Sequence, residues 1–119
     1  MMVKVLKEEY RFPRIAASAT DQKFTRILEP QPCRITEVHT SGGSSTDYDV
    51  YIYDEEDYDK INLIYSKTGI NLESHERLSK GAFTYNSEKR YIFFLINNND
   101  SGNPLDLKVK IVYELVETE

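Results

Sequence analysis

Residues 90–117 read RYIFFLINNNDSGNPLDLKVKIVYELVE, the pattern of two long β-strands joined by a polar turn. Every odd position from 105 to 115 is apolar. The even positions begin with charged side chains: Asp106, Lys108 and Lys110. Because side chains alternate between the two faces of a strand, this period of two predicts one face on a core and the other in water. Residues 91–96 are apolar on both faces, as expected for a strand in the middle of a packed sheet.

Turn-forming residues recur along the rest of the chain at intervals typical of an all-β sandwich or barrel. Further strands are expected at residues 3–12, 22–28, 33–40, 48–53, 61–66 and 78–85. In the third of these, Ile35 and Val38 have opposite parity, which predicts a β-bulge or a two-sided strand. We therefore expect a single domain, residues 1–119, that is an all-β antiparallel sandwich of seven or eight strands, of jelly-roll or Greek-key type.

The connections between the strands are also predicted from residue type. Pro13 should end the first strand, because proline cannot donate a hydrogen bond to a neighbouring strand. The SGGSS run at 41–45 predicts a flexible, exposed loop. The acidic residues after the fourth strand favour a short helical turn over 55–60. A turn is expected at 67–69, and residues 86–89 should form a hairpin into the strand that follows.

Composition excludes several classes of function. The net charge of −5 argues against nucleic acid and against anionic membrane surfaces as partners. The single cysteine, Cys33, excludes an internal disulfide framework and a cysteine-based zinc site. Residues 1–12 contain no apolar run long enough for a signal peptide, and no stretch is long enough to span a bilayer. If Met1 is the native start, we expect a cytoplasmic protein; excision from a longer secreted chain stays open.

Carboxylates are concentrated between residues 47 and 59, and calcium prefers such oxygen ligands. The candidate ligands straddle a predicted strand: Asp47, Asp49, Asp54, Asp57 and Asp59. Their spacing matches no calcium loop. We favour the interpretation of a solvated acidic loop that opposes aggregation. No cofactor is therefore expected, with calcium as the alternative.

Residues 97–102, NNNDSG, imitate the first half of an EF-hand calcium loop. Lys108 occupies the position of the bidentate glutamate, and predicted strands replace the flanking helices. This segment therefore predicts a polar turn.

The sequence contains no motif of a known catalytic centre. Absent are a nucleophile elbow, a zinc-protease helix, a phosphate-binding loop and a dinucleotide fingerprint. We therefore expect a non-catalytic protein. Cys33 and His39 lie on one predicted strand about 20 Å apart, at roughly 3.3 Å per residue, too far for a nucleophile and its base. His75 lies in the polar run ESHER, which predicts a surface loop. A two-histidine metal site would require that the segments of His39 and His75 meet.

Tyrosine is abundant, with nine residues, and tryptophan is absent. Tyr51 and Tyr53 share the strand face opposite Val50 and Ile52, and Tyr58 follows closely. Tyrosine is enriched at protein interfaces and also lines sugar-binding platforms. Because such platforms commonly use tryptophan as well, these residues favour a protein interface. The alternative interpretation, which we favour over an interface, is that these rings cover the second sheet and finish the core.

The segments DYDVYIYDEEDYD, AFTY and RYIFFLINNNDSGNPLDLKVKIVYE together resemble small β-sandwich accessory domains. These include the bacterial pre-peptidase C-terminal domain and GOLD-like modules, and a similar ending occurs in virion- and tail-associated β-proteins of phages. The matching residues are Val50, Ile52, Asp54, Tyr91, Phe93, Leu95, Asn97, Val109, Ile111, Tyr113 and Glu114. The resemblance implies a module that binds or packs against another molecule and is not a catalyst.

These observations favour a non-catalytic β-sandwich that acts through protein–protein contacts, as a homo-oligomer or as an accessory part of a larger assembly. The expected contact surface is the strand face that carries Tyr51 and Tyr53, with the acidic loop 54–59 at its rim. Strand addition at a sheet edge is an alternative route to association. The alternative is a module that binds carbohydrate or calcium through loops at one end of the sandwich.

Overall fold

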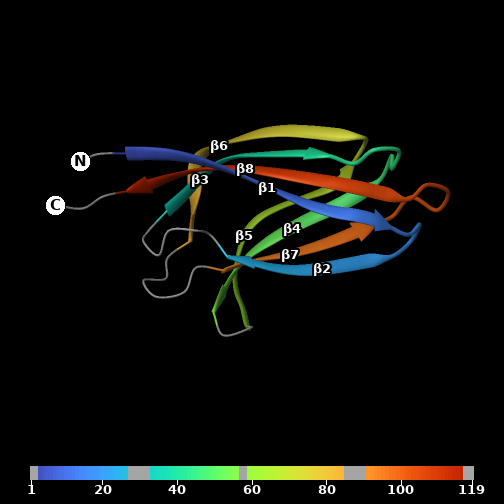
Figure 1. The fold of residues 1–119 in the computed structure, drawn as a ribbon, viewed down its shortest axis with the longest axis horizontal. Coiled ribbons are helices and arrows are strands. Elements are labelled where there is room, and N and C mark those ends of the chain that lie inside the picture. The colour runs from blue at the N-terminus through green and yellow to red at the C-terminus, as the bar shows by residue number, and fades with distance from the viewer. Residues whose placement is uncertain (1–2, 27–32, 57–58, 85–90, 117–119) are drawn as a thin grey trace.

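The structure is a computed structural model that describes residues 3–26, 33–56, 59–84 and 91–116. Its eight strands are β1 (Val3–Ile15), β2 (Thr20–Arg26), β3 (Cys33–Ser41), β4 (Tyr48–Glu56), β5 (Asp59–Ile70), β6 (Glu73–Thr84), β7 (Tyr91–Asn98) and β8 (Leu105–Val116). They form two four-stranded sheets (Figure 1). Sheet A has the order β1-β8-β3-β6, and sheet B has the order β2-β7-β4-β5. The predicted antiparallel all-β sandwich is confirmed. Within the described residues, no helix is long and apolar enough to cross a membrane.

Strands β8 and β7 each occupy an interior position of their sheet, which the sequence predicted for β7. β8 pairs with β1 on one side and with β3 on the other. Its apolar odd positions, from Leu105 to Leu115, are at most 2% exposed, and they point into the sandwich. β7 lies between β2 and β4 in sheet B, and both of its faces are covered: Phe94 is fully buried on the inner face and Phe93 is 2% exposed on the outer face.

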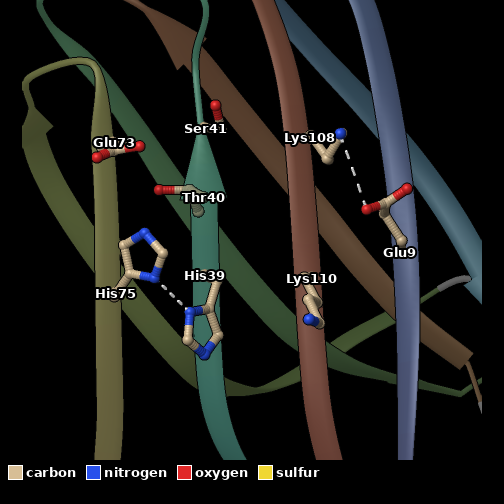
Figure 2. A pocket seen from close by; sticks show the side chains of 8 residues that line it. All are labelled: Glu9, His39, Thr40, Ser41, Glu73, His75, Lys108 and Lys110. Atoms are coloured by element: carbon tan, nitrogen blue, oxygen red, sulfur yellow. Dashed lines mark hydrogen bonds and ion pairs between the residues drawn. The ribbon is translucent and has the colours of Figure 1, made fainter.

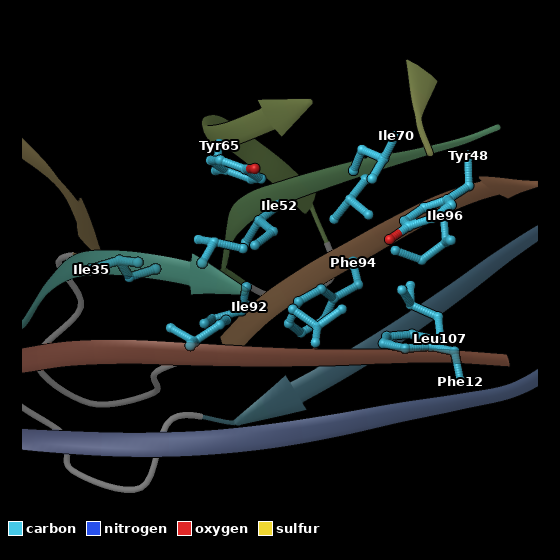
Figure 3. Packing of buried hydrophobic residues seen from close by; sticks show 14 of the residues in the cluster. Phe12, Ile35, Tyr48, Ile52, Tyr65, Ile70, Ile92, Phe94, Ile96 and Leu107 are labelled. Atoms are coloured by element: carbon cyan, nitrogen blue, oxygen red, sulfur yellow. The ribbon is translucent and has the colours of Figure 1, made fainter. Parts of the chain in front are cut away.

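The core fills the space between the two sheets (Figure 3). Aromatic rings of sheet A contact a ring of sheet B at its centre: Phe12 and Tyr10 lie 5.4 and 5.1 Å, centroid to centroid, from Phe94. Aliphatic side chains from both sheets surround these rings, among them Ile35, Ile52, Ile92, Ile96 and Leu107. Each fully buried side chain of this size stabilises the fold by about 1.5–3 kcal/mol.

The bulge predicted in the third strand is confirmed. Against β8, the register of β3 shifts between Ile35 and Glu37, so that Thr36 is the extra residue. Against β6 the register shifts at the same place, but there residues 78–81 of β6 lie between the partners of Ile35 and Glu37. The shift allows Ile35 and Val38 to be fully buried despite their opposite parity. Beyond the bulge, His39 lies on the outer face of sheet A.

The first strand does not end at Pro13, as the sequence predicted, but continues to Ile15. β1 is an edge strand of sheet A, where the missing N–H of proline leaves no partner unsatisfied. The register shifts between Phe12 and Ile15. In that interval Arg14 has a left-handed φ of 56°, and its N–H donates to Asp106 Oδ1 at 2.9 Å.

The predicted helical turn at residues 55–60 is wrong for the residues that the structure describes there. β4 continues to Glu56 and β5 begins at Asp59, and these two residues pair across the ladder. Backbone pairing therefore overrides the weak preference of acidic residues for a helix start.

Two further predicted connections are also wrong. β5 continues through residues 67–69, where Gly69 has a φ of 63°, and the chain turns instead at Leu72, with a φ of 64°. β6 and β7 lie in different sheets, so they form no hairpin. Their connecting residues 85–90 lie outside the described ranges. Alternation along one strand carries no information about the sheet that the next strand joins.

Candidate functional site

The two outer faces of the sandwich differ in chemistry. Charged and polar side chains cross the outer face of sheet A in cross-strand rows (Figure 2). One row consists of Glu9, Lys110, His39 and His75, and the next consists of Arg11, Lys108, Ser41 and Glu73. Glu9 and Lys110 are opposite charges in the first row, whereas Arg11 and Lys108 in the second row are both cationic. Lys108 Nζ lies 4.0 Å from Glu9 Oε1 in the neighbouring row. This face is suited to contact with water.

The outer face of sheet B is apolar and aromatic over the middle of its strands. We call this surface the tyrosine face; its residues are Tyr51, Tyr53, Leu63, Phe93 and Leu95. In the strand register, Tyr53 lies between Phe93 of β7 and Leu63 of β5, and Tyr51 lies beside Leu95. The rings of Tyr53 and Phe93 meet edge to face, with centroids 6.2 Å apart. Leu63 is 53% exposed, so this surface reaches solvent at its β5 edge.

The structure places Tyr51 and Tyr53 on the outer face of sheet B, both half-buried. Their neighbours Val50 and Ile52 are fully buried between the sheets. The two tyrosines therefore lie outside the core between the sheets, and Tyr53 packs on Phe93, which is 2% exposed. This position fits both an interface and the alternative that the rings cover the second sheet. Tyr58 lies outside the described residues.

The predicted calcium ligands are divided between the two ends of the β4–β5 hairpin. Asp47 and Asp49 lie at the start of β4, whereas Asp54 lies near its end and Asp59 begins β5. Along the extended strand, Asp49 and Asp54 are about 17 Å apart, at roughly 3.3 Å per residue. Asp57 lies outside the described residues. Within the described part of the chain, no group of three or more His, Cys, Asp or Glu residues is placed to hold a metal ion.

At the end of the sandwich where β7 leads to β8, the Asp100 carboxylate binds neighbouring loops. It accepts hydrogen bonds from the backbone N–H groups of Thr46, Gly102 and Asn103, at 2.9, 2.8 and 3.0 Å, and from the Thr46 hydroxyl at 3.0 Å. These bonds, first of all that from the Thr46 backbone, hold the pKa of Asp100 well below its ordinary value. The carboxylate is thus engaged in turn formation, as predicted for residues 97–102.

Asn98 connects three loops at the same end. Its side chain is buried, and Nδ2 lies 3.2, 3.2 and 3.0 Å from the carbonyl oxygens of Ile15, Ala16 and Asn103. Its Oδ1 accepts a hydrogen bond from the Ser45 hydroxyl at 2.8 Å. Because Ser45 is fully buried, the prediction of an exposed SGGSS loop is wrong at this residue. In the sequence, this polar network is visible only as the run NNND at residues 97–100.

The two histidines, which the sequence placed on a strand and in a loop, are neighbours. β6 begins at Glu73, so His75 lies in a strand directly opposite His39. Their Nδ1 atoms are 2.6 Å apart (Figure 2). The sequence does not predict that β6 extends to His75. The inward residues beside it, Ser74 and Glu76, are polar, so they show no apolar alternation.

Neither a model of a known protein family nor a curated protein sequence matches this chain. The resemblance to pre-peptidase C-terminal and GOLD-like domains therefore stays a prediction. The roles of the residues described above therefore rest on the geometry of the structure.

Proposed function

We propose that this protein is a non-catalytic β-sandwich that self-associates through the tyrosine face. The observation that carries the proposal is the contrast between the two outer faces. Uncharged side chains cover the middle of sheet B, with Leu63 53% exposed, whereas charged side chains cover sheet A. Within the tyrosine face Leu63 is exposed, Tyr51, Tyr53 and Leu95 are half-buried, and Phe93 is 2% exposed. Tyrosine is enriched at protein interfaces.

A second copy of the chain is the partner that this surface fits best. In a two-fold symmetric dimer the same patch faces itself, so a charge that lies on the axis meets the same charge of the other copy. The tyrosine face contains no charged residue and avoids this repulsion, whereas the face of sheet A does not.

A specific dimer requires the whole outer face of sheet B, with the tyrosine face as its uncharged centre. Four strands about 4.8 Å apart, each about nine residues long at roughly 3.3 Å per residue, cover about 550 Å². Two such faces bury about 1,100 Å² in total, which reaches the lower limit of about 1,000 Å² for specific interfaces. A weak dimer, with dissociation in the micromolar range, is expected.

Sedimentation velocity over a range of protein concentrations tests the proposal with a matched pair of variants. Leu63→Glu places a charge on the tyrosine face, and Val5→Glu places the same charge on β1 of sheet A. The two native side chains are almost equally exposed, 53% and 56%. We expect the wild type and Val5→Glu to form dimers and Leu63→Glu to remain monomeric. Equal behaviour of the two variants, or a wild type that is monomeric throughout, would contradict self-association through this face.

We also infer that the sandwich is of the jelly-roll type. The inference is supported by the strand orders β1-β8-β3-β6 and β2-β7-β4-β5, in which every connection except β4–β5 passes from one sheet to the other. A jelly roll is a double sheet of eight strands built from two Greek keys. An experimental structure with a different strand order in either sheet would contradict it. Since one fold serves many functions, the proposed function rests on the tyrosine face and not on the fold type.

A further inference from the structure

The outer face of sheet A contains a cross-strand histidine pair. His39 of β3 and His75 of β6 are direct register partners, with Nδ1 atoms 2.6 Å apart and ring planes at 84° (Figure 2). The side chain of His39 is 27% exposed, and His75 is exposed, so solvent and dissolved ions reach both rings. Imidazole nitrogens are among the commonest metal ligands in proteins.

The hydrogen bonds of the two histidines leave a nitrogen lone pair that can bind a metal ion. His39 Nε2 lies 3.2 Å from Glu37 Oε1. The carboxylate accepts a hydrogen bond from Nε2–H, and this tautomer leaves the Nδ1 of a neutral His39 as an acceptor that faces His75. A carboxylate that orients the distal nitrogen of a histidine is the usual support of a histidine ligand in metal sites.

We propose that His39 and His75 together bind a divalent transition-metal ion of the zinc, copper or nickel type through their Nδ1 atoms. Zn–N distances of about 2.0–2.1 Å in tetrahedral geometry place two ligand nitrogens about 3.3 Å apart. The two Nδ1 atoms must therefore separate by about 0.7 Å, which is a small rotation for two rings at a solvent-exposed surface. The ion replaces the proton that the two nitrogens share, and this proton is released to water.

The surroundings of the pair set the expected strength and selectivity of the site. Lys110 is the register partner of His39 on β8, and its positive charge opposes a bound cation. Glu37 beside His39, and Glu73 on the same face of β6, offset that charge. With two protein ligands and water in the other positions, the site is weaker than a four-ligand structural zinc site. Calcium and magnesium prefer oxygen ligands, so they are excluded by the nitrogen donors.

A bound ion would join β3 to β6, the edge strand of sheet A. The two histidines are 36 residues apart in sequence, and the folded chain brings them together. A ligand that binds only the folded chain stabilises it, so the ion should raise the melting temperature.

Isothermal titration of the full chain with Zn²⁺, repeated with Ni²⁺, tests the proposal. We expect one ion per chain for the wild type. His39→Gln and His75→Gln should each weaken binding at least tenfold. The control variant, Glu9→Gln, changes a carboxylate in the same row on β1, and we expect its affinity to stay within twofold of the wild type. Melting temperature should rise with Zn²⁺ and not with Ca²⁺.

Melting curves in the presence of a chelator verify that the histidine variants are folded, as expected for exposed side chains. A readout on the wild type needs no variant: electron paramagnetic resonance of bound Cu²⁺ should show coupling to nitrogen ligands. Undiminished binding by His75→Gln, an oxygen-only Cu²⁺ spectrum, or the absence of binding at millimolar Zn²⁺ would overturn the proposal.

Discussion

Gly42 lies directly against the ring of Tyr48. A Cβ atom at Gly42 would stand 2.5 Å from Tyr48 Cε1 and 2.8 Å from Leu105 Cδ1. Tyr48 is fully buried, and its hydroxyl forms hydrogen bonds of 3.0 Å with Thr40 Oγ1 and with the carbonyl oxygen of Leu72. The loop between β3 and β4 can thus close over the core because residue 42 has no side chain.

We expect Gly42→Ala to lower the free energy of unfolding by about 1–3 kcal/mol, the usual cost of adding a methyl group to a packed core. Urea denaturation measures this change. Gly102→Ala is the control, because its Cβ would meet only Asp100 Oδ1 at 3.8 Å, an ordinary contact. A Gly42→Ala variant as stable as Gly102→Ala would show that the loop does not pack on Tyr48 in this way.

Asn98 should be among the most sensitive polar residues of the described chain. Asn98→Ala removes the side-chain donors to Ile15 and Asn103 and the acceptor for Ser45. At about 1–3 kcal/mol for each buried group left without a partner, we expect a loss of roughly 3 kcal/mol in urea denaturation. Asn99→Ala, an exposed neighbour, should change stability by less than about 0.5 kcal/mol. Similar losses for both variants would contradict the role of Asn98.

The hydrogen bonds of Asp100 should make the stability of the fold sensitive to acid. The backbone N–H of Thr46 and its other donors lower the pKa of this carboxyl in the folded chain below its ordinary value of 3.8. The unfolded chain therefore binds the proton more readily, and the stability that Asp100 contributes is present above about pH 4 and is lost as the pH falls further. We expect the melting temperature to fall more steeply below about pH 4 in the wild type than in Asp100→Asn. Parallel curves for the two proteins would count against these hydrogen bonds.

The buried hydroxyl of Tyr65 should make the stability of the fold sensitive to alkaline pH. Burial raises the pKa of its hydroxyl above 10.0, and the hydrogen bond of 2.7 Å that it donates to Glu76 raises it further. Its stability contribution is therefore complete below pH 10.0 and is lost as the pH rises towards the raised pKa. Thermal melts at increasing alkaline pH should show a steeper loss for the wild type than for Tyr65→Phe. The prediction fails if Tyr65→Phe loses stability as steeply as the wild type.

Local patterns in the sequence were sufficient to predict several strands and the bulge. The alternation from Leu105 to Leu115 predicts both the existence of β8 and its buried face, because burial on one side imposes a period of two. The parity change between Ile35 and Val38 likewise reports an extra residue at Thr36. The strand order, in contrast, depends on contacts between distant segments, such as β1 with β8, which no local pattern encodes.

The same distinction applies to the candidate sites. The outward position of Tyr51 and Tyr53 follows from their alternation with Val50 and Ile52, and the structure confirms this position. The proximity of His39 and His75 depends on the pairing of β3 with β6, and the polar inward residues of β6 conceal that strand. A long-range contact between polar residues leaves no periodic signal in one sequence.

The mass of the chain in solution, measured by light scattering after size exclusion, tests self-association most directly. A single chain has a mass of 13.9 kDa. We predict a mass that approaches twice this value well above micromolar concentrations and falls to the single-chain mass on dilution. A mass of 13.9 kDa at every concentration, with the tyrosine face intact, would contradict the proposal that this face binds a second copy.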